Sequence, residues 1–357
     1  MIEQIDIQNF RSFKELRLRE IQPVTLIFGD NGSGKTSLLE ALFLACGASP
    51  ELLQRTNAWR GMDAKHYSGQ VEDVDRALWG DVFHQLNTDV KAKISLRGTQ
   101  SHERRSVTIT YRDGGITKLV PPSRDQTRTK AGLVRGNRVR FEYHVDGYGD
   151  FVVEPYVQNG QLVIDNQFEA NFKASFVSSS RLGFSGETAT RFSKLSVNYD
   201  SETFVSQFRK KFESIKGLSI ETMGGNPMLY ASVEGLSQKI PLGSVSGGMT
   251  KLATILLSMS EHKNGCIIID EIENGFYFDR MEEIWAVILE FSDVYNCQIF
   301  ASTHSYECMK ALNRASGETN FEEYTYLRTE LKDGVTKVYR VPGKSLLRAL
   351  EYNIEVR

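Results

Sequence analysis

The stretch TLIFGDNGSGKTSLLEALFLA, residues 25–45, decides the fold of this chain. It begins inside an apolar run from Val24 to Phe28, the pattern of a strand that is buried on both faces. A glycine-rich turn follows and ends in Lys35 and Thr36, with the spacing G-x-x-x-x-G-K-[ST] of a phosphate-binding loop. Residues 37–45 then show the pattern of a helix with an apolar inner side. Strand, glycine turn and helix in this order predict a loop that holds phosphate.

The chemistry of such a loop depends on its backbone and on two side chains. Glycines let backbone amides turn inward around phosphate groups, and the helix N-terminus adds a partial positive charge. Lys35 can reach the β- and γ-phosphates of a nucleotide, and the Thr36 hydroxyl can ligate Mg²⁺. An ordinary glycine turn is the competing interpretation. The nucleotide-binding residues predicted in this segment are Asn31, Gly32, Gly34, Lys35, Thr36 and Ser37.

Two acidic residues end a second apolar run, GCIIIDE at 265–271. We expect Asp270 to hold Mg²⁺ through water, and Glu271 to orient and deprotonate the attacking water. Consecutive acids also occur in solvated turns, but here an apolar strand leads directly into them. The run therefore predicts a catalytic strand end, and it removes most of the support for an ordinary glycine turn upstream.

Two further segments fit a nucleotide site once the first two are in place. Residues 244–251, SVSGGMTK, place a serine and two glycines before an apolar helix, which is a further anion-binding helix start. Residues 298–305, QIFASTHS, form another apolar strand that ends in Thr-His. A lone histidine is more often structural than catalytic. At the end of a strand that follows the two acids, however, His304 is predicted to sense the γ-phosphate.

The order of these four segments resembles the ABC-type ATPase heads of the SMC/RecF/OLD class. The opening IDIQNFRSF, residues 5–13, is similar to the first strand of those heads. Residues 269–285, IDEIENGFYFDRMEEIW, and the ending ALEYNIEVR resemble a narrower group, the OLD-like ATPases that act with a nuclease or another effector. The resemblance covers residues 1–48 and 240–357 well and the middle of the chain poorly.

The resemblance implies a fold and a set of ligands. The implied fold is α/β, an ABC-type P-loop ATPase head with a mixed sheet and a helical subdomain, plus an α+β insertion at 49–239. The sequence has no sustained heptads, so no long coiled coil is expected. The implied ligands are ATP and Mg²⁺, and Ser246, Gly247 and Gly248 would cap the γ-phosphate bound by a second copy. Arg11 would lie near the nucleotide, although it could equally be a surface residue after a strand.

Three departures from the pattern concern how the γ-phosphate is sensed. Met249 stands where transporter-type heads usually have glutamine. Such heads also have a glutamine loop, for which this sequence offers several candidates. In place of their usual D-loop this sequence has ENGFYFD, in which Asp279 is a weak candidate for the D-loop aspartate. The glutamine candidates are Gln158, Gln161 and Gln167.

Composition limits the class of protein. A chain of 357 residues with 40% apolar content can bury a substantial core. No run of 18 uncharged apolar residues occurs, and the first ten residues lack a signal-peptide layout, so we expect no membrane partner. The four cysteines have no metal-ligand spacing and are expected to be reduced packing residues of a cytoplasmic protein.

The middle of the chain mixes helical and strand patterns. Residues 75–86, DRALWGDVFHQL, show a helical pattern, and residues 201–216 show another in which Phe204, Phe208 and Phe212 are expected in the core. Alternating patterns predict strands in four segments between them, KAKISLRG, RSVTITYRD, RVRFEYHVDG and LVIDNQF.

A basic segment spans residues 97–140, which carry eleven Lys/Arg and three Asp/Glu although the whole chain has a net charge of −2. Such a segment can be a solvated face, a contact for nucleic-acid phosphates, or a contact for an acidic protein. No base-reading motif accompanies it, so any DNA contact should be independent of sequence. The basic residues concerned are Arg104, Arg105, Arg124, Arg128, Lys130, Arg135, Arg138 and Arg140.

The OLD resemblance raises the question of a nuclease within the chain. A TOPRIM nuclease domain needs a Glu and an Asp-x-Asp at strand ends, and the one such string is EDVDR at 72–76, in a polar stretch without flanking strands. We interpret it as a charged surface. Any nuclease activity must then belong to a separate subunit.

The leading hypothesis is an ATP-gated switch. Two copies would close head to tail on two ATP molecules, in a dimer or a higher homo-oligomer. Hydrolysis would release them, and a separately encoded effector, such as a TOPRIM-type nuclease, would respond. The OLD-like resemblance implies anti-phage defence, by analogy with the ATPase subunit of the PARIS system. The alternative is a RecF-like ATPase that binds duplex DNA in repair or recombination. A scaffold that barely turns over ATP and a transporter motor are weaker alternatives.

Overall fold

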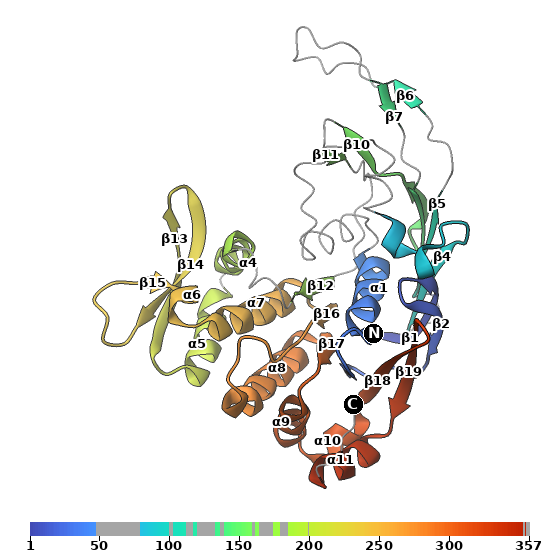
Figure 1. Cartoon of the computed structure of the whole chain (residues 1–357). Helices are drawn as coiled ribbons and strands as arrows, with labels where there is room; N and C mark the ends of the chain where they lie inside the picture. Colours follow the sequence, from blue (N-terminus) through green and yellow to red (C-terminus); the bar gives the residue numbers. More distant parts are fainter. Residues whose placement is uncertain are drawn as a thin grey trace.

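The fold is known for eleven stretches of the chain. The computed structural model describes residues 1–47, 79–99, 103–111, 117–119, 133–135, 139–158, 161–163, 174–178, 185–198, 200–352 and 354. Two six-stranded sheets dominate these stretches, and the helix after the phosphate loop, α1 (Lys35–Gly47), lies between them (Figure 1).

The first of these sheets, the core sheet, carries the segments that the sequence assigned to a nucleotide. Neighbouring strands are parallel except the last pair, which is an antiparallel hairpin, so the predicted mixed sheet is confirmed. In spatial order the strands are β12 (Ala174–Val177), β16 (Cys266–Ile269), β17 (Gln298–Thr303), β3 (Val24–Phe28), β18 (Thr325–Lys332) and β19 (Val335–Val341).

The three central strands of the core sheet are buried throughout, which explains their continuous apolar sequences. Alternate residues of a strand face opposite sides. On β3, Ile27 packs in the cluster that includes α1, whereas Leu26 and Phe28 pack with the helices of the other face. Because β3, β16 and β17 are parallel, their carboxyl ends meet at one edge of the sheet, where ligands bind in open α/β folds.

The second six-stranded sheet, the outer sheet, is antiparallel and packs on the other side of α1. Helix α1 is therefore buried on nearly all sides, rather than on one inner side as its sequence predicted, because it has a sheet on each flank. In spatial order the strands are β2 (Phe13–Leu18), β1 (Ile2–Phe10), β4 (Ala92–Gly98), β5 (Arg104–Tyr111), β8 (Val139–Val145) and β9 (Gly149–Val153).

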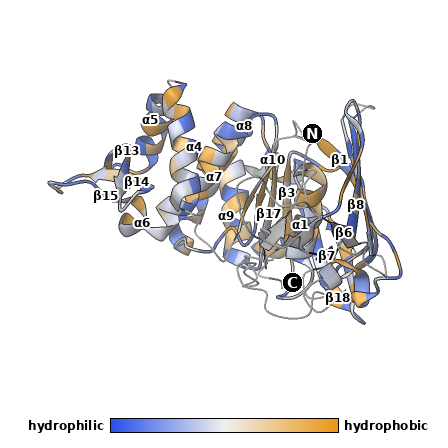
Figure 2. Cartoon of the chain, turned by 90° about the horizontal axis from the view of Figure 1, so that it is seen from above, coloured by the Kyte–Doolittle hydropathy of each residue, from blue (hydrophilic) through white to orange (hydrophobic). Residues whose placement is uncertain are grey.

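A group of helices covers the face of the core sheet that points away from α1, as Figure 2 shows from above. The two longest helices in the described stretches, α7 and α8, have fifteen residues each, so no long coiled coil is present there. None of the described helices is both long and apolar enough to cross a membrane. The helices are α4 (Ser185–Val197), α5 (Ser201–Lys211), α6 (Leu242–Val245), α7 (Gly247–Glu261), α8 (Met281–Tyr295), α9 (Tyr306–Ser316), α10 (Glu318–Glu323) and α11 (Gly343–Glu351).

Three small sheets complete the described structure. The three-stranded one packs against α4 and α5, and the other two are short hairpins. Phe204 and Phe208 of α5 are fully buried, which confirms their place in the core. The strands are β13 (Ile215–Met223), β14 (Asn226–Val233) and β15 (Ile240–Pro241), then β10 (Tyr156–Gln158) with β11 (Gln161–Val163), and β6 (Thr117–Leu119) with β7 (Leu133–Arg135).

Two helix predictions need correction. Helix α5 ends at Lys211, because the chain turns there into strand β13, so the helix predicted over 201–216 was too long. The helix predicted over 75–86 is wrong for its described part, which forms only the short turns η1 (Gly80–Val82) and η2 (His84–Leu86). This part is held instead by the end of β1, since Phe83 forms a bridge with Phe10.

Strands from the middle of the chain complete both large sheets. Strand β12 is an edge of the core sheet, and four of the six strands of the outer sheet come from residues 92–153. The division into a core at 1–48 and 240–357 and an insertion at 49–239 stays a prediction about the sequence. In the structure, the intervening residues contribute to the same layers as the core.

Candidate nucleotide site

The phosphate loop lies between β3 and α1, at the carboxyl edge of the core sheet. Gly29, Gly32 and Gly34 all have positive φ angles, of 145°, 77° and 101°, in a region that side chains disfavour. The turn is closed by a hydrogen bond from the Ser33 amide to the Asp30 carbonyl at 3.2 Å. The loop therefore has the backbone shape that its glycines predicted.

Lys35 is folded back into this loop. Its Nζ donates to the carbonyl oxygens of Gly29 at 2.7 Å and Asp30 at 2.8 Å, and the side chain is almost fully buried. Burial lowers the pKa of Lys35, and the neighbouring carboxylates, Asp270 first among them, act in the opposite direction. The ammonium group is thus held at the loop, where phosphate oxygens can replace the two carbonyls.

Thr36 and Asp270 meet although 234 residues separate them in sequence. The Thr36 hydroxyl lies 3.3 Å from both carboxylate oxygens of Asp270, and the Ser302 hydroxyl donates to one of them at 2.6 Å. Burial raises the pKa of Asp270, while the hydrogen bond from Ser302 lowers it. The sequence prediction missed Ser302, although a hydroxyl at the end of the neighbouring apolar strand was a usable signal.

This pair fits a magnesium ion that is bound together with a nucleotide. Mg²⁺ in such sites uses one or two protein oxygens and completes its shell with water and phosphate. The Thr36 hydroxyl and the Asp270 carboxylate are adjacent and can supply those two oxygens. Among the described residues, no group of three His, Cys, Asp or Glu side chains is arranged to hold a metal ion.

Glu271 follows Asp270 with a positive φ of 44°, which is rare for a residue other than glycine. Its amide donates to the Ser302 hydroxyl at 2.8 Å. Its carboxylate accepts a hydrogen bond of 2.5 Å from the side-chain amide of Asn274. Ser302 therefore holds both acids, and Asn274 fixes the direction of the Glu271 carboxylate.

His304 lies directly after β17 and is positioned by an acid that the sequence prediction missed. The His304 backbone amide donates to the Glu273 carboxylate at 2.9 Å, and His304 Nδ1 lies 3.0 Å from the same oxygen. Glu273 is mostly buried, whereas the histidine ring is 41% exposed. A third acid in the run DEIE was the available signal. Asp270, Glu271 and His304 are thus gathered at one edge of the sheet.

The segment Ser246–Gly248, here called the signature, begins helix α7 as predicted. A side chain at Gly248 would approach the Gly275 carbonyl to 2.6 Å, so only glycine fits between the two segments. One turn later, Lys251 Nζ donates to the carbonyls of Glu271 at 2.8 Å and Asn274 at 3.0 Å. Burial lowers the pKa of Lys251 to about 8. The sequence prediction missed this lysine, which ties α7 to the loop after the acids.

The signature opens into a hollow of about 1050 Å³. Ser246, Gly248 and Met249 line it, together with Asp279 and residues of α5, α8 and α9, and none of the described lining residues belongs to the phosphate loop. The large side chains of Tyr277 and Phe278 are 82% and 70% exposed. In this hollow of one copy, therefore, the signature is accompanied by no described residue of the phosphate loop.

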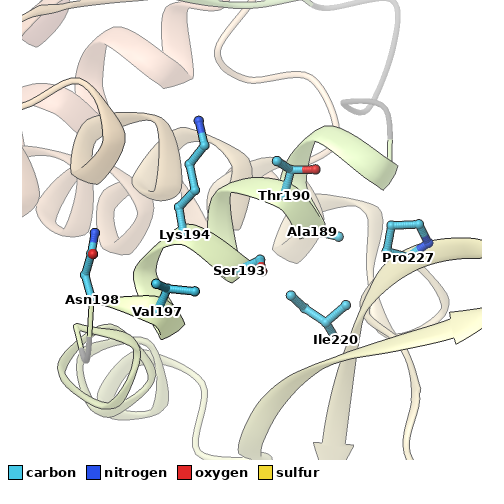
Figure 3. A pocket seen from close by; sticks show the side chains of 8 residues that line it. All are labelled: Ala189, Thr190, Ser193, Lys194, Val197, Asn198, Ile220 and Pro227. Carbon is cyan, nitrogen blue, oxygen red and sulfur yellow. The ribbon is translucent and has the colours of Figure 1, made fainter.

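Two other hollows flank α4 on its contact with the β13–β14 hairpin. The one in Figure 3 has a volume of about 410 Å³, and the view shows Val197 and Ile220 on opposite sides of it. The second, of about 670 Å³, extends toward α5. Neither is lined by a residue of the phosphate loop, the acidic strand end or the signature.

The position of Arg11 near a nucleotide stays a prediction, and the structure shows which groups this residue bonds to. Its Nε lies 2.6 Å from the Glu40 carboxylate on α1, and its Nη1 pairs with Asp81. The residue is 7% exposed, so the surface interpretation is wrong. A buried guanidinium requires acidic partners, and these two take up its charge. The structure thus shows Arg11 as a link between the β1–β2 turn, α1 and the segment around Asp81.

Several predicted residues lie elsewhere or outside the described stretches. Arg105 donates to the Cys46 carbonyl at 3.3 Å, and Arg140 pairs with Glu142 and Glu154. Gln158 and Gln161 belong to the β10–β11 hairpin rather than to the core sheet. Outside the described residues lie Arg124, Arg128, Lys130, Arg138, Gln167 and the string at 72–76, while Arg135 lies in β7 and Arg104 begins β5.

Two family models match the chain. One, described as "AAA domain", matches residues 4–222, and the other, described as "AAA domain, putative AbiEii toxin, Type IV TA system", matches residues 158–310. The first match spans more than half of the sequence. The chain belongs to this AAA domain family.

The proteins that resemble this chain are either distant over its full length or similar over a short segment only. An "ATP/GTP phosphatase" of Helicobacter pylori is 24% identical over 99% of this chain and 98% of its own length. The DNA replication and repair protein RecF of Idiomarina loihiensis is 51% identical, over 12% of each chain. A solved Smc head domain, bound to the C-terminal domain of ScpA from Pyrococcus furiosus, is 11% identical over 99% of each chain with a TM-score of 0.49, a loose likeness.

Proposed function

We propose that this AAA domain is a Mg²⁺-dependent ATPase of the SMC/RecF class that works as an ATP-gated dimerising switch. The observation that carries the proposal is the meeting of Thr36 with Asp270, 3.3 Å apart, beside the buried Lys35. The full-length similarity to a protein named ATP/GTP phosphatase supports hydrolysis as the reaction.

Each side chain of the site has a role in this proposal. Lys35 leaves the loop carbonyls to bind the β- and γ-phosphates, and Thr36 and Asp270 hold Mg²⁺, which supplies charge neutralisation at the phosphates when bound. Glu271 turns from Asn274 to accept a proton from the attacking water. Glu273 holds His304 at the strand end beside the γ-phosphate.

A second copy of the chain completes each site. The hollow at the signature of one copy is lined by no described residue of the phosphate loop, and the exposed side chain of Tyr277 lies at it. Two copies placed head to tail would bring each signature onto the nucleotide of the other. Such an arrangement is closed and symmetric, so it stops at a dimer and holds two nucleotides.

We further propose that a separately encoded effector, such as a TOPRIM-type nuclease, responds to the dimer in anti-phage defence. The family description that mentions a type IV toxin–antitoxin system supports a defence role. We place the cycle in the cytoplasm, where the four buried, unbonded cysteines would stay reduced.

The experiment compares the purified chain with Glu271→Gln, which keeps the shape of the side chain and removes the base. We expect the wild type to hydrolyse ATP with Mg²⁺ and the variant to lose turnover by about 10²-fold or more. Light scattering should find the variant at twice the monomer mass in ATP and at monomer mass without it. Glu20→Gln is the matched control, because Glu20 is 85% exposed.

The result that would contradict the proposal is equally specific. If Glu271→Gln binds ATP and stays at its ligand-free mass, ATP does not drive dimer formation. If the wild type binds ATP without hydrolysing it, the chain is a nucleotide-binding scaffold.

A RecF-like role is the alternative, favoured by the 51% identity to a RecF protein over a short segment. Duplex DNA should then raise ATP turnover, and this effect should fall steeply with salt. Arg105 and Arg140 are engaged within the fold, so Arg104, whose side chain is exposed, is the better described residue to reverse. Loss of DNA stimulation in Arg104→Glu would favour this alternative.

A further inference from the structure

The three glycines of the phosphate loop differ in what surrounds them. At Gly32 an added side chain would meet nothing within 4 Å, because this part of the loop faces open space. At Gly29 it would overlap the Thr329 backbone carbonyl, and at Gly34 it would overlap the Thr336 side chain. Two of the three glycines are therefore needed for contact with the β18–β19 hairpin, on the protein side of the loop.

Thr329 of β18 connects the entry of the loop to its exit. Its hydroxyl lies 2.6 Å from the Ser33 hydroxyl and 3.3 Å from the Phe28 carbonyl. One hydroxyl can accept from Ser33 and donate to Phe28, which gives a chain of two hydrogen bonds across the base of the loop. Thr329 is 2% exposed, so water does not compete for these bonds.

Thr336 of β19 holds the loop from a second point. Its hydroxyl donates to the Ser33 carbonyl at 3.1 Å, and its methyl group also lies against Gly34. Its backbone amide donates to the Ser12 carbonyl at 2.9 Å, which joins the hairpin to the turn between β1 and β2. Thr336 is likewise 2% exposed. The last residues of the loop are thus fixed between the β1–β2 turn and the β18–β19 hairpin.

We infer that Thr329 and Thr336 are positioning residues of the nucleotide site. They hold the phosphate loop in its binding shape before any nucleotide arrives, and they do so through Ser33. A loop that is already shaped loses less conformational freedom on binding, so its affinity for the phosphates is higher. The affinity part of this inference rests on the proposed ATP binding, whereas the loop-ordering part does not.

The test compares Thr329→Val and Thr336→Val with Thr325→Val. Valine keeps the branched shape and removes the hydroxyl. Thr325 is a matched control because it is fully buried on the same strand and accepts a hydrogen bond from the Gln22 amide, away from the loop. Hydrogen exchange is measured on the ligand-free full chain at residues 29–36, together with the dissociation constant for ATP in Mg²⁺.

We expect exchange at residues 29–36 to quicken by about tenfold in Thr329→Val and Thr336→Val and to be unchanged in Thr325→Val. ATP binding should weaken by about tenfold in the first two variants only, even where all three lose similar thermal stability. Thr336→Ser, which restores the hydroxyl, should return both values toward the wild type.

The inference would be overturned if residues 29–36 of Thr329→Val and Thr336→Val exchanged hydrogen at the wild-type rate. It would also be overturned if exchange quickened equally in these two variants and in Thr325→Val. If the wild type binds no ATP, the proposed function fails. The exchange measurement still decides whether the hairpin orders the loop, since it needs no nucleotide.

Discussion

The phosphate-loop side and the signature side of the molecule differ in where their polar groups find partners. Lys35, Thr36 and Asp270 all bond to groups of the same chain. Ser246 begins α7 without a side-chain cap bond, and Tyr277 and Phe278 beside it are exposed. The polar groups of the phosphate-loop side are bonded within the copy. The signature side instead exposes a helix start and two aromatic rings to solvent. This difference fits the proposed interface between copies.

Mixing two inactive variants gives the largest expected effect. Lys35→Ala damages only the phosphate-loop side and Ser246→Arg only the signature side, and each alone should lower turnover by about 10²-fold. In a one-to-one mixture, half of the dimers carry one intact composite site, so about a quarter of wild-type turnover should return. Steady-state hydrolysis by the mixture measures this.

A control mixture tests whether turnover returns when no dimer contains an intact composite site. Lys35→Ala and Glu271→Gln both damage the phosphate-loop side, so no combination of them contains an intact site and no recovery is expected. Absence of recovery in the first mixture would mean that the two sides do not act across copies.

The second largest effect is expected from Lys251, which bonds helix α7 to the loop after Glu271. Burial lowers the pKa of Lys251 to about 8, so between pH 8 and 10.5 the folded protein has released a proton that the unfolded chain keeps. The contribution of Lys251 to the free energy of unfolding should therefore rise with pH over this range, by on the order of 3 kcal/mol, and the wild type should gain this amount relative to Lys251→Met.

Urea unfolding of both proteins at several values between pH 7.5 and 10.5 measures this difference. Lys332→Met, at an exposed lysine, is the control and should follow the wild type. Wild-type and Lys251→Met curves that stay parallel across the range would show that this lysine is not the group that titrates.

The smallest effect on folding is expected at the exposed rings. Tyr277→Ala removes a side chain that is 82% exposed, so the free energy of unfolding should change by no more than about 0.5 kcal/mol. The ATP-dependent dimer of the Glu271→Gln background should nevertheless weaken by about tenfold, measured by sedimentation over a range of protein concentrations. Tyr148→Ala, at a ring that is 49% exposed on the outer sheet, should leave the dimer unchanged.

Sequence patterns predicted the parts of the site that lie within single segments. The strand before the phosphate loop, the strand before the acids and the strand before His304 were all found where their apolar runs indicated. A buried strand next to a helix start leaves a strong local pattern, which needs no knowledge of its neighbours.

The missed residues depend on which strands are neighbours. Ser302 reaches Asp270 because β17 pairs with β16, and Thr329 reaches the phosphate loop because β18 pairs with β3. Lys251 and Glu273 act on backbone groups that only the folded chain places beside them. For the same reason the sequence did not reveal the burial of Arg11, since its partner Asp81 lies 70 residues away in sequence.

The pairing of β18 with β3 also determines when the site can form during synthesis. The hydrogen bond between Ser33 and Thr329 can form only after the ribosome has added Thr329, 296 residues later. At ordinary rates of synthesis this takes roughly 15–60 s, during which the loop has neither its hairpin nor the neighbouring strand of its sheet. A growing chain is therefore expected to gain a shaped phosphate loop only after the β18–β19 hairpin has been made, so a copy that still lacks this hairpin would not compete for nucleotide.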